Sequence, residues 1–169
     1  RNLGLAYYRT ERDIDKAIES YETAIKHHKG NALVFYELDR LYEQVGKDPQ
    51  KRLALLRENH DVVSYRDDAL SQEIKLLVQL GENEKAHKLL SENHFFTWEG
   101  GGYIHDIHVD NSLLMGRKAW EQGNYAKALE HFKQADEYPI NQEVGRRIPD
   151  ERGPQANYNI GLAYEKLGK

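Results

Sequence analysis

The stretch from Gly116 to Pro139, GRKAWEQGNYAKALEHFKQADEYP, carries most of what the sequence says about the fold. Its small residues recur at the spacings of two helices in close contact, at Gly116, Ala119, Ala128 and Ala135. Gly123 is suited to end the first helix, and Pro139 cannot continue the second. We therefore predict a helix–turn–helix unit that buries Phe132 between its helices.

The same pattern recurs along the chain, which indicates a repeat architecture. A large or apolar residue stands four positions before each inter-helix glycine, at Tyr42, Leu77, Ala119 and Tyr164. Tyr7 holds this position in the first copy, where Glu11-Arg12-Asp13 replaces the glycine. The pattern and its N-cap signals predict helices over 2–10, 14–28, 32–45, 49–60, 67–80, 83–93, 106–122, 125–137 and 155–167. Their contacts should bury Ala17, Ala24, Ala86, Tyr42, Tyr125 and Tyr164.

This pattern resembles the tetratricopeptide repeat, a helix pair of roughly 34 residues that stacks on its neighbours. The resemblance implies an all-α, right-handed α-α superhelix, a solenoid, over residues 1–169. We expect about four units with truncated first and last repeats, and we interpret the chain as a piece of a longer protein. Two spacings exceed the repeat length by about 8 and 11 residues, which predicts inserted loops near 94–105 and 138–154.

Five phrases of the sequence are more specific than the repeat pattern: RNLGLAYY from Arg1, ELDRLY from Glu37, RLALL from Arg52, RDD from Arg66 and WEGG from Trp98. Together they resemble a narrower family, the large uncharacterised bacterial proteins whose repeats follow a mutarotase-like β-rich domain. The resemblance lies with the C-terminal repeat region of that family. It implies a carbohydrate context for the parent protein, by analogy of family alone.

The composition argues against several classes of partner. The 169 residues carry a net charge of -4, which disfavours nucleic acid as a partner, and no Cys is available for disulfides or thiolate chemistry. No apolar run reaches the roughly 20 residues of a membrane span, and no signal peptide is visible. We therefore expect neither membrane nor nucleic acid as a partner. The compartment stays open, with the cytoplasm favoured.

Chemistry-bearing residues are few. His94, His105 and His108, with Asp106 and Asp110, form a cluster that resembles metal ligands but fits no metal-binding motif. The adjacent carboxylates Asp67-Asp68 and Asp150-Glu151 are interpreted as a helix start and a solvated loop. No nucleophile–base set is evident. The sequence therefore predicts no metal, no cofactor and no enzymatic activity.

The concave face of the expected solenoid offers a candidate groove. Counting from the register positions places a cation at equivalent positions in three consecutive units, at Arg40, Lys75 and Arg117. Aromatic residues lie between them, at Tyr8, Tyr36, Trp120 and Tyr158. Such a groove would hold a peptide segment or another domain of the parent protein, or else an acidic sugar or other small anion. Alternatively, Arg40 and Arg117 pair with Glu43, Glu121 or Asp68 as a solvated network.

The predicted function is a non-catalytic scaffold for protein–protein or interdomain interactions in a larger bacterial protein. The alternative is a carbohydrate-linked accessory module that binds a sugar or small anion through the groove or through the loop of Trp98 and Glu99. A packing role for Trp98 is the simpler interpretation of that loop. The last helix lacks its partner, which predicts weak self-association through its open face.

Overall fold

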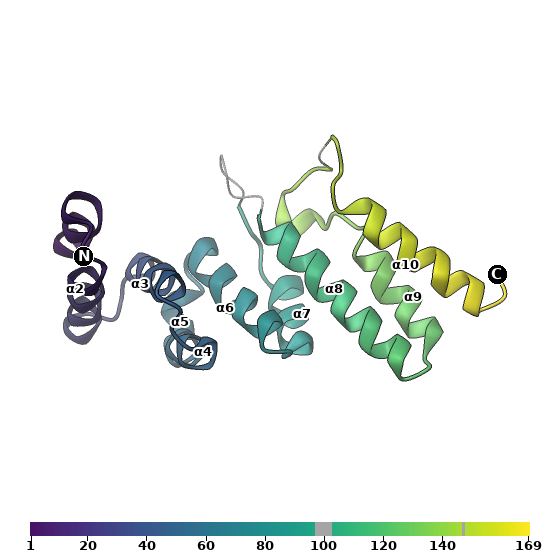
Figure 1. Ribbon diagram of the computed structural model, residues 1–169, viewed down its shortest axis with the longest axis horizontal. Coiled ribbons are helices and arrows are strands. Elements are labelled where there is room, and N and C mark those ends of the chain that lie inside the picture. The colour runs from purple at the N-terminus through teal and green to yellow at the C-terminus, as the bar shows by residue number, and fades with distance from the viewer. Residues whose placement is uncertain (97–102, 147) are drawn as a thin grey trace. The chain divides into compact units, whose positions relative to one another are not determined.

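The computed structural model describes residues 1–96, 103–146 and 148–169, which form two compact units, Arg1–Leu80 and Gly81–Lys169 (Figure 1). Within these ranges the regular structure is helical throughout and no strand occurs. The first unit contains α1 (Asn2–Ala6), a π-helical turn η1 (Tyr7–Glu11), α2 (Ile14–His27), α3 (Ala32–Gln44), α4 (Pro49–Glu58), α5 (His60–Val63) and α6 (Asp67–Gln79). The second contains α7 (Asn83–Glu92), α8 (Tyr103–Glu121), α9 (Tyr125–Gln134), a 3-10 turn η2 (Ile140–Gln142) and α10 (Gly153–Lys166).

Each unit is built by helices that pack against their neighbours in the chain. In the first unit α2 contacts both α1 and α3, and α3 contacts α6. In the second, α9 contacts both α8 and α10, so that the three helices lie side by side (Figure 1). The hydrophobic core of the second unit contains the small and aromatic residues that the repeat pattern predicted there, including Ala119, Ala128, Phe132 and Ala135. The number of repeats in the chain remains a prediction.

Glycine ends the helices at the positions that the register predicted. Gly46, Gly81, Gly123 and Gly168 have φ values of 71°, 77°, 74° and 66°, a left-handed conformation that costs glycine nothing sterically. The residue after the glycine donates its N–H back to the register residue, from Lys47 to Tyr42 (2.9 Å), Asn124 to Ala119 (2.9 Å) and Lys169 to Tyr164 (3.0 Å). These bonds satisfy carbonyl groups that the helix end leaves unpaired.

The first helix departs from the prediction of a regular helix over 2–10. Its last turn is the π-helical segment Tyr7–Glu11, and the left-handed residue is Arg12, with φ of 54°. The N–H of Asp13 reaches back to the carbonyl of Tyr7 over 3.1 Å, so the turn spans one residue more than the glycine turns do. The π turn accommodates this extra residue, as helix bulges do.

We expect Arg12→Gly to raise the free energy of unfolding of the first unit by about 0.5–1 kcal/mol. The substitution removes the Cβ that strains the left-handed conformation, and this gain exceeds the entropy that glycine adds to the unfolded chain. Urea titration followed by far-UV circular dichroism measures the change. Arg12→Ala is the control, because it removes the same charge but keeps the Cβ. Equal stabilities of the two variants would contradict the explanation.

Local capping explains four of the helix starts. Asp13, Asn31, Asp48 and Asn124 each accept a backbone N–H from the first turn of the following helix. Asp67 and Asp68 lie in the first turn of α6, as the helix-start interpretation required. Asp150 lies in the second insertion and accepts the N–H groups of Arg152 (3.1 Å) and Gly153 (2.9 Å) at the start of α10.

Some predicted details were wrong. The helix expected over 106–122 already begins at Tyr103, and the helix expected over 49–60 ends at Glu58, with the short α5 after it. The helix expected over 155–167 already begins at Gly153, whose N–H donates to the Asp150 carboxylate. Three residues that were expected to be buried are only partly buried: Ala24, Tyr125 and Tyr164.

Candidate functional site

A cavity of about 560 Å³ lies within the first unit, among α1, η1, α2 and α3. Its lining residues are Leu5, Tyr8, Arg9, Tyr21, Tyr36, Glu37, Arg40, Leu41, Glu43 and Gln44. Three of the predicted groove residues therefore line one cavity, namely Tyr8, Tyr36 and Arg40. Its volume accommodates side chains of a bound segment rather than a whole domain.

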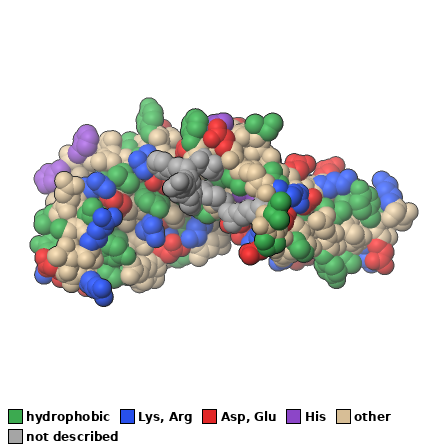
Figure 2. Space-filling view, turned by 90° about the horizontal axis from the view of Figure 1, so that it is seen from above, with side chains coloured by type: hydrophobic (Ala, Val, Ile, Leu, Met, Phe, Trp, Pro, Cys, Tyr) green, Lys and Arg blue, Asp and Glu red, His purple; other side chains and the backbone are tan. Residues whose placement is uncertain are grey.

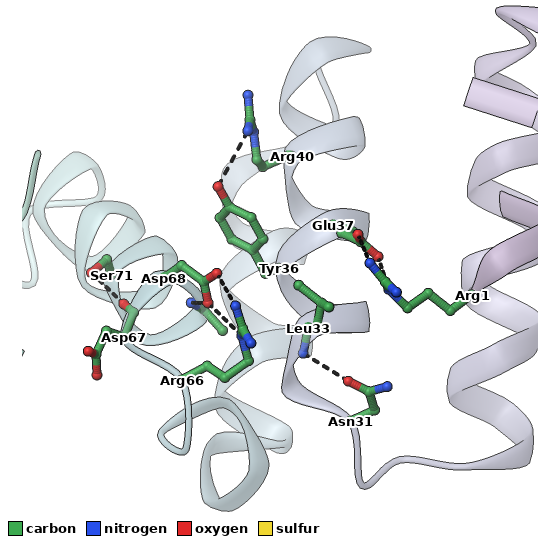
Figure 3. A network of polar contacts seen from close by, with 11 residues as sticks. Arg1, Asn31, Leu33, Tyr36, Glu37, Arg40, Arg66, Asp67, Asp68 and Ser71 are labelled. Carbon is green, nitrogen blue, oxygen red and sulfur yellow. Dashed lines mark hydrogen bonds and ion pairs between the residues drawn. The ribbon is translucent and has the colours of Figure 1, made fainter. Parts of the chain in front are cut away.

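The α3 wall of the cavity carries its most distinctive pair. Tyr36 and Arg40 lie one helical turn apart, so their side chains share a face of α3. The Arg40 guanidinium donates a hydrogen bond to the Tyr36 hydroxyl over 3.3 Å and lies 5.8 Å from the ring centroid (Figure 3). This hydrogen bond raises the pKa of Arg40 further above its already high value. The pair presents a fixed positive charge beside an aromatic ring.

The two carboxylates of the cavity are already paired. Arg1 donates two hydrogen bonds to Glu37, at 2.8 and 2.7 Å, in the bidentate arrangement visible in Figure 3. Lys75 of α6 forms an ion pair of 2.6 Å with Glu43. Burial disfavours the charged form of Glu43, but the hydrogen bond and charge of Lys75, together with the charges of Arg52 and Arg40, outweigh burial and lower the pKa of this carboxyl.

Tyr21 and Tyr8 contribute hydroxyl groups to the cavity. Burial, and then the neighbouring charge of Glu37, raise the pKa of Tyr21 to about 12. Its hydroxyl is therefore protonated throughout the physiological pH range. Tyr8 donates a long hydrogen bond, 3.4 Å, to the side-chain oxygen of Gln44 across the cavity lining.

Two guanidinium groups of the cavity remain without a carboxylate partner. Neither Arg9 nor Arg40 forms an ion pair with any residue that the structure describes. Because Glu37 and Glu43 are neutralised by Arg1 and Lys75, the cavity has an excess of positive charge. An anionic group that enters it meets two donors of the residue type that best recognises carboxylates.

Sequence analysis missed Arg9, and the helix geometry explains why. The groove positions were counted along a regular helix, at six and two residues before and one residue after each register residue, which is Tyr7 in the first copy. The π-helical turn changes the angular position of the residues that follow Tyr7, and Arg9 lines the cavity. The sequence signal that could have identified Arg9 is a positive charge next to Tyr8 at the end of a predicted helix.

Of the partners that the solvated-network alternative named in the first unit, Glu43 and Asp68 form their ion pairs with other cations, and the charge of Glu43 still acts on Arg40. Glu43 pairs with Lys75, although Arg40 lies closer along the chain. Asp68 accepts two hydrogen bonds from Arg66, at 3.0 and 2.7 Å (Figure 3). Arg40 instead bonds to Tyr36. Four phrases of the bacterial resemblance contain residues that form ion pairs, namely Arg1 with Glu37, Arg52 with Asp39, and Arg66 with Asp68.

The remaining groove residues belong to the second unit. Arg117 and Trp120 lie on α8, and Tyr158 lies on α10. Trp120 is half-buried and contacts Tyr125 edge to face, with ring centroids 4.9 Å apart, so it has a packing role in its own unit. Arg117 is exposed and Tyr158 is 68% exposed. A continuous ladder of Arg40, Lys75 and Arg117 remains a prediction.

Other candidates have different outcomes. Trp98 and Glu99 lie outside the described residues. His105 and His108 are buried and stacked on each other, while His94 pairs with Glu143. Among the described residues, no three or more His, Asp or Glu side chains are grouped so that they could hold a metal ion. The described residues also include no helix with the length and apolar character needed to span a membrane.

On the face seen in Figure 2, Lys and Arg side chains are interspersed with Asp and Glu side chains.

Helix pairs that pack on their neighbours and end at left-handed glycines define the class of this protein, an all-α superhelical repeat fold. The family model of the tetratricopeptide repeat matches residues 2–26, the segment of α1, η1 and α2.

Two solved structures share the fold. A crystal structure of the MamA protein has a TM-score of 0.59 and 21% sequence identity, over 99% of this chain and 80% of that chain. A second crystal structure of MamA has a TM-score of 0.56 and 21% identity, over 95% of this chain and 82% of that chain. At this identity the likeness establishes the fold only.

Proposed function

We propose that this chain is a non-catalytic interaction scaffold whose first unit binds a peptide segment in the cavity around Tyr36 and Arg40. The segment belongs to a partner protein or to another domain of the same parent protein. Repeat folds of this type expose elongated binding surfaces, and arginine and tyrosine are the residues that most often anchor interfaces. The bacterial, mutarotase-containing parent stays part of this proposal.

The observation that carries the proposal is the unpaired charge of Arg40 beside an aromatic wall. Its guanidinium is oriented by Tyr36 at 3.3 Å, and the structure describes no carboxylate bound to it. Holding a side chain in one orientation before binding reduces the entropy lost in the complex. The preferred segment therefore carries a carboxylate for Arg9 and Arg40, next to an apolar or aromatic residue for Tyr8 and Tyr36.

We expect Arg40→Gln to weaken peptide binding by tenfold or more, because it leaves the peptide carboxylate without its charged donor. Peptides selected on the wild-type chain from a random display library are the probes, and isothermal titration calorimetry gives their affinities. Lys51→Gln is the matched control, since Lys51 is an exposed cation of α4 outside the cavity lining. Equal losses in both variants would indicate a nonspecific charge effect and would contradict the proposal.

A second function uses the same charges. An acidic sugar or other small anion would also satisfy Arg9 and Arg40. Titration with glucuronate and with inorganic phosphate separates the two functions. If the display library yields no binding peptide, and if Arg40→Gln abolishes binding of the anion, the small-molecule site is favoured. Sugar binding that Trp98→Ala abolishes and Arg40→Gln leaves intact would favour the carbohydrate-linked loop instead.

The ladder is tested separately with Arg117→Gln. If the groove extends along the solenoid, longer selected peptides lose affinity in this variant, whereas short ones that fill only the first-unit cavity keep it. A loss with short peptides would place the site elsewhere than the cavity.

A further inference from the structure

The two insertions of the second unit are fastened to each other. The backbone N–H of Phe95, just after α7, donates to the carbonyl of Asn141 over 2.7 Å. The Asn141 side chain donates to the carbonyls of Leu90 (2.8 Å) and Asn93 (2.7 Å) at the end of α7. We call residues 138–146 the docked segment. Asn141 fixes its middle by hydrogen bonds that do not depend on pH in the ordinary range.

Ring stacking holds the first residue of the docked segment, Tyr138, on α8, and the last residue, Arg146, lies on the Tyr138 ring. The Tyr138 ring lies nearly parallel to the His105 imidazole, with centroids 4.0 Å apart and planes at 21°. The Arg146 guanidinium lies over the Tyr138 ring at 4.9 Å. His108, one turn along α8, stacks with His105 at 5.9 Å. His105 is therefore the protonatable group of α8 on which the docked segment rests.

The surroundings of His105 favour its neutral form. The side chain is 5% exposed, and its Nδ1 is buried without a hydrogen-bond partner. Burial, and then the neighbouring His108, lower the pKa of His105, while Asp106, Gln142 and Asp150 act in the opposite direction. A proton on His105 would also place a second cation near Arg146, with the Tyr138 ring between them.

Other charged groups lie around the docked segment. His94 and Glu143, at 2.8 Å, form an exposed pair that contributes little to docking. Arg146 is held by Asp136 (3.1 Å) and Asp150 (2.8 Å). Backbone hydrogen bonds, led by that of Gly153, lower the pKa of Asp150, so this ion pair persists in mild acid. His108 bonds to the carbonyl of Gln134 over 2.8 Å, and burial lowers its pKa.

We propose that residues 138–146 form a proton-sensitive latch, docked on α8 while His105 is neutral and released when His105 takes up a proton. The released His105 reaches water and regains an ordinary pKa near 6.5. Because the docked form binds the proton less well, docking is strongest above this value. It weakens as the pH falls from about 6.5 towards the pKa of the docked form. This latch is independent of the peptide site of the first unit.

Hydrogen–deuterium exchange read by mass spectrometry tests the latch on the full chain. Between about pH 7.5 and about pH 5, we expect the protection of amides in 138–146, corrected for the intrinsic exchange rate, to fall by about tenfold. The far-UV circular dichroism of the chain should stay constant over the same range. Constant protection of the segment in the wild type would overturn the proposal.

Two variants assign the effect to His105. His105→Phe keeps a ring for Tyr138 but cannot be protonated, so its segment should stay protected in acid. His94→Gln is the control and should respond to pH as the wild type does. His105→Gln serves as a second non-titrating variant if the phenylalanine disturbs the fold. A full pH response in both His105 variants, or its loss on His108→Phe with His105 intact, would overturn the assignment.

Discussion

Replacement of Arg52 by alanine is expected to lower the free energy of unfolding of the first unit by about 3–5 kcal/mol. Arg52 of α4 donates two hydrogen bonds of 2.9 Å to the carboxylate of Asp39 in α3. The two side chains are only 4% and 1% exposed. Removal of the arginine would leave a buried carboxylate without its countercharge, and water could reach it only if the helices separate.

The measurement is urea unfolding with circular dichroism, combined with hydrogen exchange in α3 and α4 to show that the first unit is affected. The double variant Asp39→Leu/Arg52→Met is the control. It replaces both charges by apolar groups, and buried ion pairs exchanged in this way often lose little or no stability. We therefore expect the double variant to be more stable than Arg52→Ala. The opposite order would show that the stability comes from the ion pair itself.

Gly116→Ala is expected to destabilise the second unit by about 2 kcal/mol, although alanine is the better helix former. A Cβ at position 116 would lie 2.3 Å from Cε1 and 2.5 Å from Cδ1 of Phe132, a ring that is 2% exposed. Such distances require α8 or α9 to move, and overpacking of this kind costs about 1–3 kcal/mol or more. The gain in helix propensity, about 1 kcal/mol, offsets only part of this cost.

Gly161 provides the matched control for this prediction. It lies in α10, and a Cβ there would meet no atom within 4 Å, so Gly161→Ala should be neutral or slightly stabilising. The double variant Gly116→Ala/Phe132→Leu should lose less stability than the sum of its single variants, because the smaller side chain makes room for the methyl group. Additive losses in urea unfolding would show that position 116 does not contact the ring.

The candidate site was partly predictable. Tyr8, Tyr36 and Arg40 were expected in one groove from their register, and they line one cavity. That counting works because residues three and four apart on a helix share a face. It missed Arg9, since the extra residue of the π-helical turn changes the angle between neighbouring side chains. Arg117, Trp120 and Tyr158 lie in the second unit, and their part in binding stays a prediction.

The sequence by itself determined where most helices start and stop. A cap such as Asn124 bonds to a residue three positions away, and a left-handed glycine such as Gly123 closes a turn with its immediate neighbours. These interactions lie within a few residues of chain, so local pattern specifies them. The same is true of the small residues at helix contacts, whose spacing follows the helical period.

Only the tertiary structure decided which distant side chains meet. Asp39 pairs with Arg52, although other cationic residues lie nearer to it in the sequence. Similarly, Glu43 pairs with Lys75 of another helix. Nothing local in the sequence places Tyr138 on His105 or Asn141 against the end of α7. Such contacts depend on how helices and insertions pack in three dimensions, where burial raises the energetic cost of an unpaired polar group. That cost selects one set of partners from the many that the sequence allows.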